Sequence, residues 1–255
     1  MLEIQNLTRR FGGLLAVSDV TTRVEPGCIN AIIGPNGAGK TTFFNLISGM
    51  YRPSSGAILL HGDNVTGLRA DQMAQRGVAR TFQATALFDQ ASVLDNLIVG
   101  HRLRTRSGLI DALLRTRRFH AEESMCRDKA RAALDFVGLG HLEERPAGDI
   151  TQEERKRVAI ALALATGPSL LLLDEPAGGI NPEETDGLAA LIRKIAKNGI
   201  TVCLVEHKMN MIMNLADKIM VLDHGEKIAE GTPAEIRANQ AVIDAYLGSE
   251  HADVH

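Results

Sequence analysis

Residues 34–41 read Gly34-Pro35-Asn36-Gly37-Ala38-Gly39-Lys40-Thr41 and hold the strongest structural signal in the chain. Two glycines enclose four residues and are followed by a lysine and a hydroxyl residue, which is the phosphate-loop pattern. The apolar residues 31–33 come directly before the loop and indicate a buried strand. After it, apolar side chains recur at i, i+3, i+4 and i+7, at Phe43, Leu46, Ile47 and Met50. The sequence therefore predicts a strand–turn–helix unit centred on residues 34–39.

The residue types of this loop suit the phosphates of a nucleotide. Glycines allow successive backbone N–H groups to face phosphate oxygens, and the helix that begins at Lys40 points its positive end at them. Lys40 would reach the β- and γ-phosphates. Thr41 would place its hydroxyl on Mg²⁺, and Thr42 could donate to an α-phosphate oxygen. The alternative is a glycine-rich turn with a solvated lysine.

A second polar feature follows a buried strand. Residues 170–173 are four leucines, and Asp174 and Glu175 come directly after them. A buried strand that ends in carboxylates delivers them to the sheet edge where α/β folds bind ligands. Asp174 would hold Mg²⁺ through water, and Glu175 could polarise the water that attacks the γ-phosphate. Taken alone, the pair could also be a strand that ends in solvated acids.

The composition excludes several other classes of protein. The 255 residues are 45% hydrophobic and carry 28 basic and 31 acidic side chains, a net charge of −3, which does not favour a nucleic-acid-binding surface. The longest apolar run, residues 158–165, is far shorter than the roughly 20 residues of a membrane span. Three scattered cysteines suggest neither a disulfide framework nor a metal site, and the N-terminus lacks a secretion signal. We expect a cytoplasmic protein.

The pattern along the chain predicts an α/β core with an insertion. Short β-like runs fill residues 2–33, and further strand-like runs occur at 170–173, 201–205 and 219–222. Residues 88–165 look helical, so 1–87 and 166–255 are expected to form the core. The insertion carries an arginine cluster: Arg102, Arg104, Arg106, Arg115, Arg117 and Arg118. This cluster is either a solvated helix face or a contact for a membrane protein or anionic lipid heads.

Together these features resemble the nucleotide-binding subunit of ABC transporters over nearly the whole chain. Thr81-Phe82-Gln83 resembles the family's Q-loop, whose glutamine contacts Mg²⁺ and the attacking water. Gly179 and Asn181 fall in the expected D-loop, and His207 follows the switch strand as the residue that senses the γ-phosphate. Phe11 lies where the family stacks an aromatic ring on adenine, and Val17 where an apolar side chain flanks it. The resemblance implies a P-loop ABC ATPase core with an antiparallel β subdomain and an inserted α-helical subdomain, in a single domain over 1–255.

The resemblance is strongest to the branched-chain amino-acid uptake class. The phrases that carry it include residues 30–34, 44–49, 80–83, 228–233 and 245–248. The ATPases of lipopolysaccharide exporters are similar in many of these phrases but usually lack the insertion near residues 100–120.

The sequence departs from the family at its signature, which is Leu-Ser-Gly-Gly-Gln. Here Ile150 is followed by Thr151, Gln152, Glu153 and Glu154, so both glycines are replaced and two acids are added. A carboxylate about 4 Å from a phosphate charge could cost up to roughly 4 kcal/mol at an effective dielectric near 20. Either the chain works in a heterodimer with a partner whose signature is intact, or the altered loop is a tolerated variant in a homodimer.

The resemblance implies a subunit that binds and hydrolyses ATP with Mg²⁺ and powers a membrane importer for branched-chain or related amino acids. Glu175 would be the general base, and His207 would stabilise the γ-phosphate. The implied partners are integral membrane permease subunits, a second ABC ATPase subunit and, indirectly, a periplasmic-type binding protein, with no nucleic acid. The implied location is peripheral, on the cytoplasmic face of the inner membrane. The alternatives are a soluble or a regulatory ABC ATPase, or the ATPase of a lipopolysaccharide-type exporter.

Overall fold

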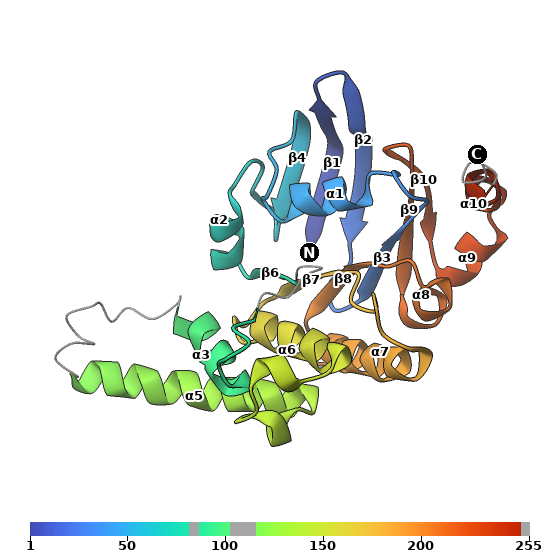
Figure 1. The fold of residues 1–255 in the computed structure, drawn as a ribbon. Helices are drawn as coiled ribbons and strands as arrows, with labels where there is room; N and C mark the ends of the chain where they lie inside the picture. Colours follow the sequence, from blue (N-terminus) through green and yellow to red (C-terminus); the bar gives the residue numbers. More distant parts are fainter. Residues whose placement is uncertain (82–86, 103–115, 251–255) are drawn as a thin grey trace. The chain divides into compact units, whose positions relative to one another are not determined.

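The computed structural model describes residues 1–81, 87–102 and 116–250 and divides the chain into two compact units (Figure 1). The first unit comprises Met1–Arg80 and Ser169–His255, and the second comprises Thr81–Pro168. Gln83 lies outside the described residues, as do Arg104, Arg106 and Arg115 of the arginine cluster. The predicted subdomain bounds at 88 and 165 stay a prediction.

The first unit is built on a six-stranded sheet, counted within the described residues. Its order is β10 (Glu226–Gly231), β9 (Lys218–Asp223), β3 (Ile29–Ile33), β8 (Thr201–Val205), β7 (Leu170–Asp174) and β6 (Val78–Arg80). All neighbours are parallel except β10 and β9. Every residue of the central strands β3, β7 and β8 is buried, as expected for apolar strands covered on both faces.

A four-stranded antiparallel sheet, again within the described part of the chain, forms the other layer of this unit. Its order is β2 (Leu14–Val24), β1 (Leu2–Phe11), β4 (Ser55–Leu60) and β5 (Asp63–Asn64). Buried apolar residues alternate with exposed ones along β1, which is typical of a sheet with one solvated face. The predicted antiparallel β subdomain is thus present, and its first hairpin turns at Gly12-Gly13.

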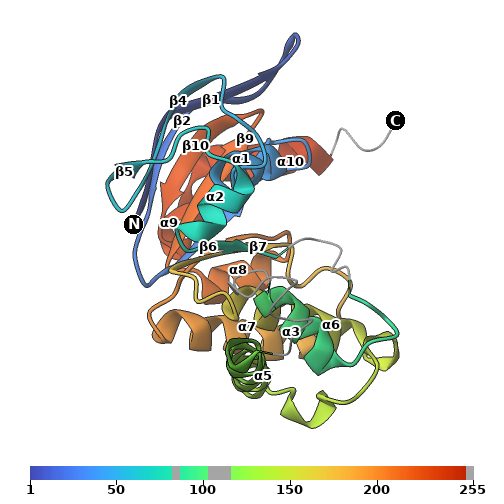
Figure 2. The ribbon, with the colours of Figure 1, turned by 90° about the vertical axis from the view of Figure 1, so that its left-hand side faces the viewer.

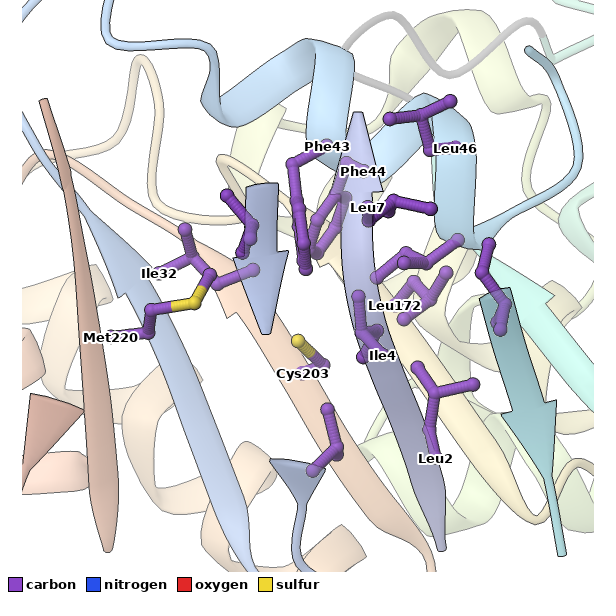
Figure 3. Packing of buried hydrophobic residues seen from close by; sticks show 14 of the residues in the cluster. Leu2, Ile4, Leu7, Ile32, Phe43, Phe44, Leu46, Leu172, Cys203 and Met220 are labelled. Carbon is purple, nitrogen blue, oxygen red and sulfur yellow. The ribbon is translucent and has the colours of Figure 1, made fainter. Parts of the chain in front are cut away.

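Helix α1 (Lys40–Ile47) lies on one face of the six-stranded sheet, and α7 (Pro182–Lys197) and α8 (Met209–Leu215) lie on the other (Figure 1, Figure 2). Phe43 and Phe44 of α1 are fully buried, in a cluster that takes side chains from both sheets (Figure 3). Ile4 and Leu7 enter this cluster from β1, and Leu172 enters it from β7. A single core therefore fixes α1, and with it the phosphate loop, between the two sheets.

The helix after the loop is shorter than the apolar spacing predicts. Helix α1 ends at Ile47, and Gly49 adopts a left-handed φ of +76°. Met50, which we expected on the buried face, is 50% exposed. The expectation was wrong because the spacing at i+7 continues past a residue whose backbone conformation stops the helix.

The remaining helices of the first unit are short: α2 (Ala70–Gln75), α9 (Pro233–Ala238) and α10 (Gln240–Glu250). Polar side chains cap α9 and also the longer α7. Asn181 caps α7 and Thr232 caps α9, each through a capping box with a glutamate three residues on.

The second unit is helical in its described residues. It contains α3 (Val93–Arg102), α5 (Arg117–Val137) and α6 (Gln152–Leu164), with 3₁₀ turns at Gly140–Leu142 and Ala147–Asp149. Leu97, Leu134 and Val158, one from each helix, are fully buried. Among the helices that the structure describes, none is long and apolar enough to cross a membrane.

We predict that Phe43→Ala lowers the free energy of unfolding by about 3–5 kcal/mol, because it opens a cavity where both sheets meet α1. Chemical denaturation monitored by circular dichroism measures the loss. Met50→Ala is the control and should change stability by no more than about 0.5 kcal/mol, since Met50 is half exposed. Equal losses in the two variants would contradict the placement of α1.

Candidate nucleotide-binding site

The phosphate loop, residues 34–39, is pressed against the main chain of two strands. Gly34 has a φ of +150° and Gly39 a φ of +93°. A Cβ atom on Gly34 would lie 2.0 Å from the carbonyl oxygen of Leu222 in β9, and one on Gly39 would lie 2.3 Å from that of Ala16 in β2. Such distances are too short for any side chain, so both positions require glycine. The loop is therefore held between the two sheets.

Lys40 begins α1 and turns its side chain back toward the loop. Its Nζ donates hydrogen bonds of 2.8 Å to the carbonyl oxygens of Gly34 and Pro35. Burial lowers the pKa of Lys40, and the nearby carboxylate of Glu175 raises it in part. The lysine thus places a cationic donor beside the backbone of the loop, and its contact with the β- and γ-phosphates stays a prediction.

A cavity of about 430 Å³ lies over this loop and brings nine of the predicted site residues together. Residues 36–42 line it, as do Glu175 and His207. Residues 14–16 of the first hairpin and residues 224–225 of the β9–β10 turn complete the wall. Sequence reasoning missed these last two segments, because each reaches the loop only through the fold. Gly225, for example, donates from its N–H to the carbonyl oxygen of Ala38 at 3.1 Å.

Glu175 and His207 meet at the carboxyl edge of the parallel sheet. Asp174 of β7 is paired with Val205 of β8, so the residues that follow these strands emerge side by side. Oε1 of Glu175 lies 2.8 Å from Nε2 of His207. Glu175 adopts a φ of +46°, a strained conformation for a residue with a side chain. The two groups are hydrogen-bonded and open to the cavity, a suitable position for polarising a water molecule.

Asp174 has a more enclosed setting than its neighbour. Its side chain is 7% exposed, and Oδ2 lies 2.7 Å from Nη2 of Arg80, which is 8% exposed. Arg80 ends β6, the strand next to β7. The carboxylate predicted to serve Mg²⁺ is thus paired with a cation of the chain itself, which sequence reasoning did not foresee.

Glu206 is a second buried charged residue near the cavity, after Arg80, that sequence reasoning missed. It is 3% exposed, and Oε1 accepts a hydrogen bond of 2.7 Å from the N–H of Ala177. Oε2 accepts from the N–H of His207 at 2.7 Å. The buried carboxylate therefore ties the segment after Glu175 to the residue that carries the imidazole.

The predicted D-loop is held mainly by its own backbone and by one lysine. Gly179 has a φ of +78°, and Oδ1 of Asn181 accepts from the N–H of Glu184 at 2.9 Å, which caps α7. Nζ of Lys208 donates to the carbonyl oxygen of Ile180 at 2.8 Å. The side chain of Asn181 thus has a structural role inside the chain.

The two residues predicted to contact the base are not brought to the cavity wall. Val17 is fully buried in the core, although its neighbours at 14–16 line the cavity. Phe11 is 37% exposed and packs edge-to-face on Tyr51, with a ring separation of 5.4 Å, while the guanidinium of Arg9 lies 4.4 Å from its ring. Adenine stacking by Phe11 and the flanking apolar contact by Val17 stay predictions.

The altered signature forms the start of helix α6 in the second unit. Thr151 is the N-cap: Oγ1 accepts from the N–H of Glu154 at 3.2 Å, and Oε2 of Glu154 accepts from the N–H of Thr151 at 2.7 Å. Glu153 is paired with Arg157 one turn further along the helix, and Gln152 is exposed. Both added carboxylates are therefore engaged with groups of their own helix.

A glycine-dependent phosphate loop after β3, an imidazole after the neighbouring strand β8 and carboxylates at the end of β7, the strand beyond it, define a P-loop nucleotide-binding protein. A family model described as ABC transporter matches residues 17–178. A second model, described as branched-chain amino acid ATP-binding cassette transporter, matches residues 226–252.

Proteins similar to this chain match it along almost their whole length. The high-affinity branched-chain amino acid transport ATP-binding proteins BraF of Pseudomonas aeruginosa and LivG of Escherichia coli are each 42% identical over 97% of this chain and 98% of their own. A solved ATP-binding cassette of an ABC transporter in its ADP conformation shares 29% identity, with a TM-score of 0.86 over 97% of this chain and 98% of its own. A solved nucleotide-free ATP-binding cassette of an ABC transporter has a TM-score of 0.85 over 96% of this chain and 98% of its own. The chain belongs to the ABC transporter family, and its fold is that of an ABC ATPase.

We predict that Gly39→Ala destabilises the protein by at least about 2 kcal/mol more than Gly37→Ala. Both glycines have positive φ, so both variants meet a backbone cost of about 1–2 kcal/mol. Only at Gly39 does the new Cβ meet a carbonyl oxygen, while nothing lies within 4 Å of the one at Gly37. Urea denaturation of the two purified variants measures the difference. Equal stabilities would show that the loop does not approach β2 as described.

Proposed function

We propose that this chain is the ATP-binding and ATP-hydrolysing subunit of a membrane importer for branched-chain or related amino acids. The observation that carries the proposal is the full-length similarity to subunits named for high-affinity branched-chain amino acid transport, which includes the class-specific segment 226–252. The subunit works with integral membrane permeases, from the cytoplasmic face of the inner membrane, and a periplasmic-type binding protein delivers cargo to the permeases.

ATP is held by its phosphates in this proposal. The backbone N–H groups of residues 36–39 and the Nζ of Lys40 bind the β- and γ-phosphates, because they line one cavity at the positive end of α1. Thr42 donates to the α-phosphate from the same wall.

The residues also fit Mg²⁺, because the hydroxyl of Thr41 and the carboxylate of Asp174 are oxygen donors of the kind this ion prefers. Thr41 lines the cavity beside Lys40. When bound, the ion supplies positive charge to the phosphate oxygens. Gln83, outside the described residues, is its third proposed contact.

Glu175 is the general base in this proposal, and His207 is its partner. The 2.8 Å contact between Oε1 and Nε2 fixes the direction of the carboxylate and keeps it at the cavity wall. Glu175 accepts a proton from the attacking water, while His207 donates a hydrogen bond to the developing charge on the γ-phosphate.

We predict that Glu175→Gln lowers ATP turnover at least about 100-fold in the assembled transporter and leaves ATP binding intact. The amide keeps the size of the side chain but cannot accept a proton. Phosphate release measures turnover, and a fluorescent ATP analogue measures binding. Glu183→Gln is the control, since this acid lies in the first turn of α7 and does not line the cavity. Turnover within twofold of the unmodified transporter in Glu175→Gln would remove Glu175 from this role.

We further propose that the second ATPase subunit is a different chain with an intact signature. The capping box at Thr151 and the pair between Glu153 and Arg157 support this, because they satisfy the start of α6 from within the chain. A helix start that already holds a carboxylate has less attraction for a phosphate group. In the resulting pair, ATP on the loop of this chain faces the partner's signature, and the chain's own signature faces the other nucleotide.

This arrangement predicts that the purified chain alone hydrolyses ATP at least about tenfold more slowly than the complete transporter. It also predicts that Glu175→Gln, which traps ATP, does not by itself dimerise with ATP. A variant with Gln152→Gly, Glu153→Gly and Glu154→Gln added should dimerise, since it restores the glycines and removes both acids. Size-exclusion chromatography with light scattering distinguishes the two. ATP-dependent dimers of the chain with its natural signature would favour the homodimer.

A further inference from the structure

Arg80 is the centre of a buried polar cluster beside the nucleotide site. Its Nη2 lies 2.7 Å from Oδ2 of Asp174. Its Nη1 donates to Oδ1 of Asn45 at 2.7 Å and to Oγ of Ser48 at 2.8 Å. The guanidinium also lies 5.5 Å from the centre of the Phe44 ring. Three elements thus meet at this side chain: β6, β7 and the end of α1.

The geometry of the cluster holds the guanidinium in place. Asn45 and Ser48 lie on the last turn of α1 and just after it, and α1 is fixed by the buried Phe43 and Phe44. A planar guanidinium with several donors can reach these acceptors and the carboxylate at once, which an ammonium cannot do with the same geometry. The positive charge of Arg80 is therefore fixed beside Asp174.

We propose that Arg80 is a positioning residue that balances the charge of Asp174 in the metal-free protein and weakens the binding of Mg²⁺ to the nucleotide complex. This rests on the proposed function, in which Asp174 serves the ion. A buried carboxylate without a cation is strongly destabilising, so Arg80 keeps the empty site folded. The guanidinium also occupies Oδ2 of Asp174, so a divalent cation must compete with it for this carboxylate and binds less tightly than Asp174 alone would allow. The metal and the nucleotide can then leave after each turnover.

The test is a titration of the full chain with Mg²⁺ in the presence of saturating fluorescent ADP, followed by fluorescence. Arg80→Gln should bind Mg²⁺ about tenfold more tightly than the unmodified chain, because the ion no longer competes with a guanidinium for the carboxylate of Asp174. Arg80→Lys keeps the charge and should stay within about twofold. Arg69→Gln is the control for net charge, because Arg69 is exposed and pairs with Asp71 rather than with a member of this cluster. Unchanged or weaker Mg²⁺ binding in Arg80→Gln overturns the proposal.

A double-variant comparison shows whether Arg80 acts through Asp174. In the Asp174→Asn background, adding Arg80→Gln should leave Mg²⁺ affinity unchanged, since the charge that Arg80 balances is gone. If Arg80→Gln still raises Mg²⁺ affinity tenfold in this background, Arg80 does not act through Asp174 and the proposal is overturned. Thermal unfolding gives a second readout. Without Mg²⁺, Arg80→Gln should have a lower melting temperature than the unmodified chain. The gap, meaning this difference in melting temperature, should narrow when Mg²⁺ and ADP are added. A gap that does not narrow contradicts the proposal.

If Arg80→Gln does not fold, the unmodified chain still provides a test. The side-chain ¹⁵N resonance of Arg80 should shift when Mg²⁺ is added to the ADP complex, because the cation approaches the partner of the guanidinium. An unmoved resonance overturns the inference. A chain that binds no nucleotide in any of these experiments would instead contradict the proposed function.

Discussion

The parallel register of β3, β8 and β7 is the constraint on which the rest of the structure depends. These strands are buried along their full length, and their pairing brings their carboxyl ends to one edge. The phosphate loop, Glu175 and His207 each follow one of them, so a shift of one residue in any pair would separate the groups. The hydrogen bond between Glu175 and His207 is a direct result of this alignment. Burial of the leucine, isoleucine and valine side chains of these strands thus fixes the relative positions of the polar residues that follow them.

The sequence predicts those parts of the site whose signal is local. The phosphate loop is recognisable because its glycines, lysine and threonine stand at fixed spacing, and Asp174 and Glu175 because they end an apolar run. The polar strand β10 and the short strands β5 and β6 gave no such signal, since their place depends on their neighbours in the sheets. No local sequence pattern predicts the order of the strands or the packing of the β9–β10 turn against the loop.

Arg80 and Glu206 show why buried charges escape sequence reasoning. Arg80 and Asp174 are separated by 94 positions, and Glu206 reaches Ala177 across 29. The local sequence around Arg80, at the end of a short strand, and around Glu206, beside a histidine, gives no signal of burial. Only the fold shows that both side chains are enclosed. Each satisfies its charge inside the chain, because an enclosed charge without a partner would be strongly destabilising. Such residues tie separate elements of the site to one another.

The charged groups of the altered signature also find their partners within the chain. Glu154 and Thr151 satisfy each other's backbone N–H groups, and Glu153 is paired with Arg157. The two acids therefore contribute to the helix that they begin, where negative charge is favourable. In the phosphate loop the opposite holds, because residues 37–39 carry no side-chain oxygen that would compete for the backbone donors. One helix start is thus completed by its own side chains and the other is shaped for an external anion. An asymmetric pair of subunits, in which the two helix starts of this chain have different tasks, is the arrangement that this contrast favours.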